Sequence, residues 1–80
     1  MRLDELKIGQ SGTVVNVAGT GQIRKRILDL GLTKGARIRM LRKAPLGDPV
    51  EIEVRGYRLT LRLSESDFVE IEETPEVESA

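Results

Sequence analysis

The chain has 80 residues and a mass of 8.9 kDa, enough for one small domain but not for a multidomain enzyme. It contains neither cysteine nor histidine, which excludes disulfides, zinc knuckles, thiol nucleophiles and the usual general base. Basic and acidic residues balance at 13 each, yet residues 24–62 carry eleven bases and four acids, whereas residues 63–80 carry seven acids and no base. The zero net charge therefore conceals a basic body and an acidic C-terminal end.

The first 20 residues predict a short turn followed by a strand. Leu3, Leu6 and Ile8 are spaced to cover the core from a turn or half-helix. Residues 13–18 are rich in β-branched side chains and are bounded by glycines, which is typical of a strand. No apolar run is long enough to span a bilayer, and the N-terminus lacks the apolar stretch of a signal peptide. We therefore expect a cytoplasmic protein.

A helix is the best-marked element, and it is predicted over residues 22–30. Its apolar side chains fall at i, i+4 and i+7, the spacing of one face of an amphipathic helix. Those side chains belong to Ile23, Ile27 and Leu30. Thr20 is the expected N-cap, and Gly31 is the expected C′ residue of a Schellman motif in which Leu32 contacts Ile27.

The segment after the helix predicts a bent strand and a stiff turn. Residues 36–43 alternate until Leu41 breaks the parity, which indicates a β-bulge or barrel corner near Met40 and Leu41. Residues 44–49 are turn formers throughout. Asp48 in this turn has two compatible interpretations. Its carboxylate accepts turn amides and orders the loop, or the loop is presented to a partner.

Residues 50–54 and 57–63 predict a β-hairpin that Arg55 and Gly56 close as a two-residue turn. The expected pairs are Val54 with Tyr57, Ile52 with Leu59, Val50 with Leu61 and Glu53 with Arg58. This register gathers apolar residues, Tyr57 included, on the inward face and an opposite-charge pair on the outer one. Because the same pairing satisfies both the apolar face and the charged face, the sequence specifies a single register.

A short turn over residues 64–67 and a strand over 68–72, with Val69 and Ile71 inward, complete the pattern. Five short strands with one inserted helix predict an all-β fold, a small SH3-like barrel in which the terminal strands close the sheet. The domain is expected to span residues 1–73. Residues 74–80 have nothing to bury and predict a disordered acidic tail, which is hypothesised to screen the basic body.

Two motifs stand at a defined spacing along the chain. One is Leu-Asp-Leu-Gly-Leu at residues 28–32, with Gly35 closing the segment, and the other is Ala-Pro-Leu-Gly-Asp-Pro at residues 44–49. Together with the strand pair that follows and the terminal Val-Glu-Ile, they resemble the ferrous iron transport protein A (FeoA) family over about residues 6–71.

The resemblance implies the same SH3-like barrel and a non-enzymatic, cytosolic accessory role in bacterial ferrous iron uptake. The implied partner is the FeoB membrane permease, which carries a cytosolic GTP-binding domain, so the chain would be peripheral to the membrane through that partner. Action by contact between proteins rests on analogy with other SH3 modules. Two residues depart from the family pattern: Lys34 stands where proline is usual, and Ser66 where a small or apolar residue is common.

No catalytic residue, cofactor or tightly bound metal is predicted. Ferrous iron favours imidazole together with carboxylates, and this chain offers only carboxylates and carbonyls. The acid pair Glu51 and Glu53 shares a polar strand face with basic neighbours and has no nucleophile beside it. We therefore expect that the chain is not an enzyme and that any role in transport is indirect.

The candidate partner-binding residues lie on the flank of the predicted helix and in the proline-rich loop. They are Arg24, Arg26, Asp29, Pro45, Leu46, Gly47, Asp48 and Pro49. The two prolines stiffen the loop and lower the entropy lost on binding. Structural roles are assigned to Thr20, Gly31, Gly35 and Gly56.

Other functions stay open from the residues alone. A shared basic face would bind nucleic acid in a salt-dependent way. Its members would be Arg24, Lys25, Arg26, Arg37, Arg39, Arg42 and Lys43. The two aromatic residues and the acidic end make nucleic acid the minor alternative. A free-standing regulatory module related to the C-terminal domain of metal-dependent repressors, and weak self-association, are the remaining hypotheses.

Overall fold

The computed structural model describes residues 1–74 of the chain. Five strands form one antiparallel sheet in the order β4-β3-β2-β1-β5. The strands are β1 (Ser11–Val17), β2 (Arg37–Lys43), β3 (Val50–Val54), β4 (Tyr57–Leu61) and β5 (Val69–Glu73). Three helical segments join them: the 3-10 helix η1 (Leu3–Glu5), α1 (Gly21–Asp29) and α2 (Leu63–Ser66). The predicted five strands with one inserted helix are confirmed.

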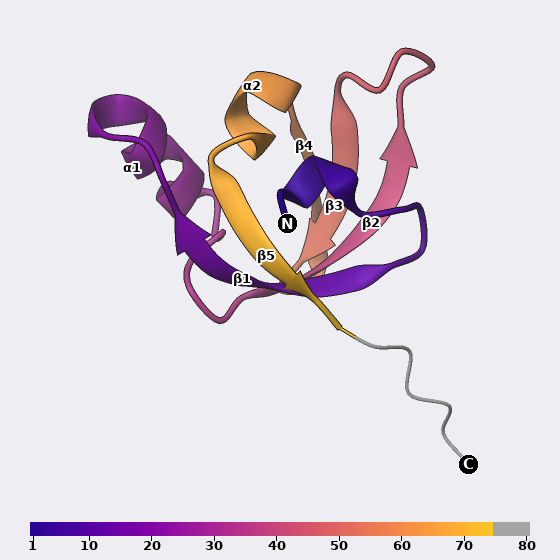
Figure 1. The fold of residues 1–80 in the computed structure, drawn as a ribbon, viewed down its shortest axis with the longest axis horizontal. Coiled ribbons are helices and arrows are strands. Elements are labelled where there is room, and N and C mark those ends of the chain that lie inside the picture. Colours follow the sequence, from indigo (N-terminus) through magenta and orange to yellow (C-terminus); the bar gives the residue numbers. More distant parts are fainter. Residues whose placement is uncertain (75–80) are drawn as a thin grey trace.

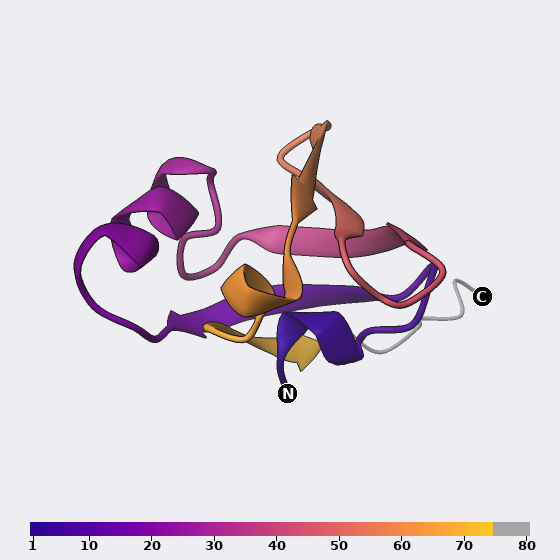
Figure 2. The ribbon, with the colours of Figure 1, turned by 90° about the horizontal axis from the view of Figure 1, so that it is seen from above.

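The sheet is strongly bent. Figure 2 shows the β3–β4 hairpin turned away from β1 and β5, while η1 lies against β5 and α2 in the middle of the curl (Figure 1). The terminal strands pair as predicted, because β5 runs antiparallel to β1 from Val69 to Glu73. The bent sheet places α1 on one side of α2 and the β2–β3 loop on the other (Figure 1).

The β3–β4 hairpin has the predicted register, with Val54 opposite Tyr57 and Glu53 opposite Arg58. Its turn residue Arg55 has a φ of 51°, and the following glycine is also at positive φ, as a type I′ turn requires. The bulge expected near Met40 is confirmed too, since the pairing of β2 with β3 shifts there. A second bulge, between Val14 and Asn16 in the pairing of β1 with β5, was not anticipated.

Inward-facing side chains of all five strands, η1 and α1 form the core. The buried apolar residues are Leu3, Leu6, Val14, Val17, Ile27, Leu32, Ala36, Ile38, Met40, Val50, Ile52, Val54, Leu61, Val69 and Ile71. Each large aliphatic side chain buried in this way contributes about 1.5–3 kcal/mol to folding. Alternate residues of β2 and β3 face this core, so the outer face of both strands is left to charged side chains.

Two side chains that were predicted to face the core are exposed. Ile8 is 62% exposed because it lies in a turn closed by the hydrogen bond from the Gln10 N–H to the Lys7 carbonyl. Tyr57 is 44% exposed because its hydroxyl donates a hydrogen bond to the Leu30 carbonyl at the end of α1. The prediction that Ile8 and Tyr57 face the core was therefore wrong, although the strand alternation that placed Tyr57 was right.

The ends of α1 match the sequence in part. Gly31 N–H donates to the Leu28 carbonyl and Leu32 N–H to the Ile27 carbonyl, the two bonds of a Schellman motif. Thr20 occupies the N-cap position with an extended backbone, but its side chain makes no capping hydrogen bond. The predicted C-terminal cap and the predicted N-cap position of Thr20 are therefore both confirmed, although the Thr20 side chain does not take part in the capping.

The turn predicted over residues 64–67 is the single-turn helix α2. Ser66 within it is fully buried, and its hydroxyl donates to the Leu63 carbonyl at 3.1 Å, so the polar group is satisfied. After β5, Thr74 N–H donates to the Ser11 carbonyl at 2.9 Å. The acidic tail predicted over 74–80 otherwise lies outside the described residues. Within residues 1–74, no helix has the length and apolar character needed to cross a bilayer.

Candidate functional site

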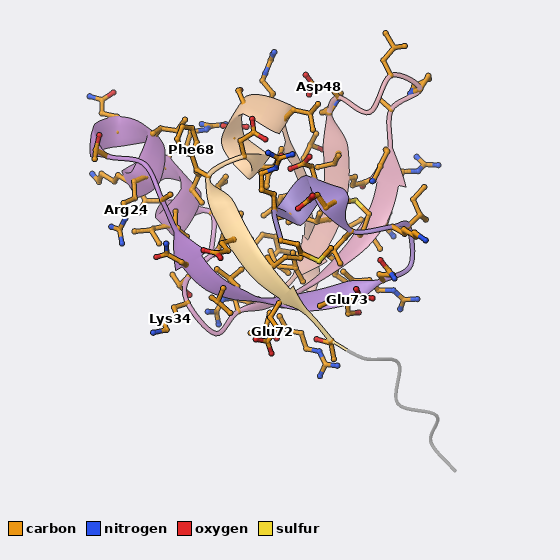
Figure 3. All side chains as sticks on the ribbon, viewed as in Figure 1. Arg24, Lys34, Asp48, Phe68, Glu72 and Glu73 are labelled. Carbon is orange, nitrogen blue, oxygen red and sulfur yellow. The ribbon has the colours of Figure 1, made fainter. Side chains whose placement is uncertain are left out.

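Helix α1 is fastened to the sheet and to α2 by two arginines that stand two residues apart and therefore point to different sides of the helix. The Nε atom of Arg24 donates to the Val17 carbonyl of β1 at 3.2 Å. The Nε atom of Arg26 donates to Glu65 Oε2 of α2 at 2.7 Å, a charge-assisted hydrogen bond. Figure 3 labels Arg24 on the outer side of α1. The helix is thus held from two sides by polar bonds.

The tip of the β3–β4 hairpin holds the C-terminal end of the same helix. Arg55 donates from Nε to the Gly31 carbonyl at 3.3 Å and from Nη2 to Thr33 Oγ1 at 2.8 Å. Tyr57 adds the hydroxyl bond to the Leu30 carbonyl. The bonds to Gly31 and Leu30 satisfy carbonyls at the end of α1 that have no partner within the helix, and all three bonds attach this end of α1 to the hairpin.

Glu65 joins α1 to the start of α2. Its Oε1 atom accepts the Arg62 N–H at 3.0 Å, while Oε2 accepts Arg26. The backbone bond from Arg62 is the main reason that the pKa of Glu65 lies below its ordinary value. The side-chain bond and charge of Arg26 and the charge of Arg62 act in the same direction, and partial burial opposes them.

Asp48 ties the proline-rich loop to α2. Its Oδ1 atom accepts the N–H of Leu63, the first residue of α2, at 3.0 Å. The sequence suggested that this carboxylate accepts amides of its own turn; the observed partner lies 15 residues further along the chain. Asp48 therefore acts as a cap supplied from another part of the chain, at a helix N-terminus that favours negative charge.

These bonds enclose a groove between α1 and α2, which we call the helix groove. Its wider part, of about 640 Å³, is lined by Gln22, Ile23, Arg26, Asp29, Leu30, Arg62, Ser64 and Glu65. A smaller part, of about 290 Å³, is lined by Arg26, Asp48, Pro49, Thr60, Arg62 and Glu65. The half-buried Ile23 and Leu30 give the wider part an apolar component. Two arginines and three carboxylates line the whole groove, so its charge is nearly balanced.

The structure brings four of the predicted partner-binding residues together in the helix groove: Arg26, Asp29, Asp48 and Pro49. Arg24 lies outside it and bonds to β1. Pro45 lines a separate hollow at the base of its own loop. Gly47 lines neither part of the groove, and Leu46 is 95% exposed in the same loop.

The groove also contains residues that sequence reasoning did not assign to it. The sequence pattern places Ile23 and Leu30 on the core face of a helix, and Arg62 and Glu65 in a strand and a turn. The one available signal was the spacing of Arg62 and Glu65, since an acid three residues after a helix N-cap is typical of a capping box.

The three predicted structural glycines all adopt a positive φ, which side chains disfavour, and one of them also lacks room for a side chain. Gly31 has a φ of +100°, and a Cβ there would lie 2.5 Å from the Tyr57 hydroxyl. Gly56 has a φ of +85° in the hairpin turn, with open space around it. Gly35, also at positive φ, donates its N–H to the Val14 carbonyl at 2.7 Å.

The basic residues expected to share one face are divided between several environments. Arg42 forms an ion pair with Glu51 at 3.9 Å, and Lys43 Nζ donates to the Asp4 carbonyl at 3.0 Å. Arg26 is paired within the helix groove. Local partners thus account for part of the charge that the sequence assigned to a single surface.

The carboxylates within residues 1–74 do not gather into a metal centre. Glu51 is paired with Arg42, and Glu53 lies across the strands from both Arg39 and Arg58. In the part of the chain that the structure describes, no three potential protein ligands stand close enough together to hold a metal ion.

Comparison with known proteins identifies the family. A family model described as FeoA domain matches residues 1–73. The chain belongs to the FeoA domain family. It is 40% identical over 72 residues to the Fe(2+) transport protein A/Fe(2+) transporter FeoB fusion protein of Porphyromonas gingivalis (strain ATCC BAA-308 / W83). That match covers 90% of this chain but only 8% of the fusion protein, in which FeoA and FeoB share one polypeptide.

Solved structures agree with this assignment. The FeoA-like protein of Clostridium acetobutylicum is 32% identical, with a TM-score of 0.88 over 100% of this chain and 93% of its own. FeoA of Chlorobium tepidum is 40% identical, with a TM-score of 0.86 over 99% of this chain and 75% of its own. FeoA of Stenotrophomonas maltophilia, solved with zinc and described as an SH3 domain protein, is 34% identical (TM-score 0.78; 90% and 89% covered). The predicted SH3-like fold is confirmed.

The same fold occurs in a regulatory protein. A manganese-dependent transcriptional repressor superimposes with a TM-score of 0.84 over 92% of this chain and 36% of its own, at 16% identity. At this identity the likeness concerns the fold alone.

Proposed function

We propose that this chain is a non-enzymatic accessory protein of bacterial ferrous iron uptake. It acts in the cytoplasm, by contact with the cytosolic GTP-binding part of a FeoB-type permease. The observation that supports this most is the relative in which FeoA and FeoB form one polypeptide. Fusion gives two domains a high effective concentration for each other, which is useful when their contact is weak. A separate chain must supply the same contact through its own surface.

The helix groove and the neighbouring loop supply a suitable surface. Leu46 is 95% exposed between Pro45 and Gly47, and the hydrogen bond of Asp48 to α2 anchors this loop beside the groove. An exposed aliphatic side chain on a loop stiffened by proline is a good anchor, because little conformational entropy is lost when it is buried. We propose that Leu46 enters a pocket of the permease while the groove contacts the surrounding surface.

Isothermal titration calorimetry against the purified cytosolic part of the cognate permease tests this. The titration is made in nucleotide-free, GDP-bound and GTP-analogue-bound states. We expect binding in at least one state and a loss of about tenfold or more for Leu46→Asp, as for a central anchor residue. Ile8→Asp is the matched control, since Ile8 is also an exposed aliphatic residue in a turn, 62% exposed and outside the groove. Absence of binding in every state would refute the proposed partner.

A nucleic-acid-binding function is the weaker candidate. Its support is the group of arginines on the outer face of β2, whereas the pairing of Arg26 and Arg42 with carboxylates weakens it. Titration with a short nucleic-acid duplex at low ionic strength distinguishes the two candidate functions. Phosphate contacts would give binding that falls steeply with added salt.

A further inference from the structure

A second hollow lies on the outer face of the sheet, and we call it the basic hollow. It has a volume of about 380 Å³ and is lined by Ser11, Arg37, Ile38, Arg39, Glu53, Arg55 and Gly56. Three arginines therefore face one glutamate, in contrast to the nearly balanced helix groove. The two hollows share no lining residue.

Two of the three arginines come from one strand. Arg37 and Arg39 are two residues apart on β2, so both side chains project from its outer face, and both are exposed. Among the hydrogen bonds and ion pairs found within residues 1–74, neither side chain has a protein partner. Within that part of the chain, their guanidinium groups can bind a ligand without breaking an existing bond.

The third arginine is already held in position. Arg55 is fixed by its bonds to the Gly31 carbonyl and Thr33 Oγ1, which use Nε and Nη2 and leave Nη1 uncommitted. It also adopts a φ of 51° in a turn position where glycine or asparagine is usual. A held guanidinium loses little further freedom when it binds an anion, which favours affinity.

The surroundings limit the size of the anion. Next to β2 lies β1, which has no charged residue, and beyond it β5 presents carboxylates at Glu70 and Glu72 on the same face. Thr13 of β1 pairs with Arg37 on one side and with Glu72 on the other. The acidic strand is thus two strand spacings, about 10 Å, from the strand that carries Arg37 and Arg39. A long polyanion or an anionic bilayer would meet those carboxylates, whereas a short acidic segment would not.

We propose that the basic hollow binds a short run of acidic side chains on a partner protein. The carboxylates pair with the guanidinium groups of Arg37, Arg39 and Arg55, whose planar donors match the two oxygens of a carboxylate. Glu53 is the one acidic residue among the lining residues, so it repels the carboxylates of the ligand. It therefore restricts the site to ligands that place their carboxylates over β2. This proposal is independent of the permease contact, because it uses a separate set of residues.

The test uses a blocked hexaglutamate peptide as the probe and NMR titration of the full chain. At low ionic strength we expect saturable shifts at Ser11, at residues 37–39 and at Arg55 and Gly56. Affinity should fall several-fold as salt rises from about 20 to about 200 mM, because charge attraction is screened over that range. The double variant R37Q/R39Q should weaken binding about tenfold or more.

The matched control is R42Q/R58Q, which removes the same charge from two exposed arginines outside the basic hollow. Binding of this variant should stay within about twofold of the parent value, and melting temperatures should verify that both variants fold. An equal loss in the control would overturn the proposal, since it would show only diffuse attraction. Absence of binding would also overturn it, as would tighter binding of a thymidine hexanucleotide that R37Q/R39Q abolishes.

Discussion

The helix groove and the basic hollow show how one chain of zero net charge presents two unlike surfaces. In the helix groove, Arg26 is paired with Glu65, and Asp48 is bonded to the backbone of α2. In the basic hollow, Arg37 and Arg39 project from β2 toward solvent. Charges that are paired within the protein position elements, while unpaired charges are available to a partner. Arginines therefore position the helices that form the helix groove, whereas the arginines of the basic hollow are available to an acidic ligand.

Gly31→Ala should have the largest effect on the helix groove. The substitution places a side chain at a φ of +100° and against the Tyr57 hydroxyl, so it strains the backbone and displaces the bond to Leu30. We expect a loss of about 2–3 kcal/mol in unfolding free energy. Chemical denaturation measures it. Gly47→Ala is the control, since Gly47 has a similar φ but open space around it; an equal loss there would show that the Tyr57 contact is irrelevant.

Asp48→Ala should have an intermediate effect. It leaves the Leu63 N–H without its acceptor, which should cost about 1 kcal/mol, as for the loss of a helix cap. It should also release the loop that carries Leu46 from α2 and weaken binding to the permease. Asp48→Asn keeps an acceptor oxygen and should retain most of the stability. If alanine and asparagine behave alike in denaturation, the capping role is wrong.

Glu65→Gln should have the smallest effect and a defined pH dependence. Because the folded state lowers the pKa of Glu65 below 4.5, its carboxylate contributes stability above that pH and loses it as the pH falls through the folded value. At neutral pH we expect Glu65→Gln to cost about 0.5 kcal/mol, since Arg26 is largely exposed. Melting temperatures of both proteins should converge as the medium is acidified below 4.5. A constant difference across pH would contradict this role.

Much of the fold can be predicted from local sequence patterns, whereas the helix groove cannot. The hairpin register and the Schellman motif depend on residues within a few positions of each other, so alternation and glycine placement predict them. The bonds that build the helix groove join residues 15 to 39 positions apart: Asp48 to Leu63 and Arg26 to Glu65. Those contacts depend on how far the sheet bends, which periodicity does not encode.

Two exposed side chains also show that spacing alone does not determine burial. Ile8 and Tyr57 have the hydrophobicity and spacing of core residues. One nevertheless lies in a turn, and the other reaches past the end of its strand to the end of α1. The partner-binding assignment of the loop came from its composition and from the FeoA resemblance; its attachment to α2 required the structure.

The most direct test of the proposed contact is an NMR titration of the full chain with the cytosolic part of its cognate permease. We expect the largest shifts at Ile23, Arg26, Leu46 and Asp48, with little change at Arg37 and Arg39. Leu46→Asp should remove these shifts, and Ile8→Asp should leave them in place. Shifts confined to the outer face of β2, or no shifts in any nucleotide state, would contradict it.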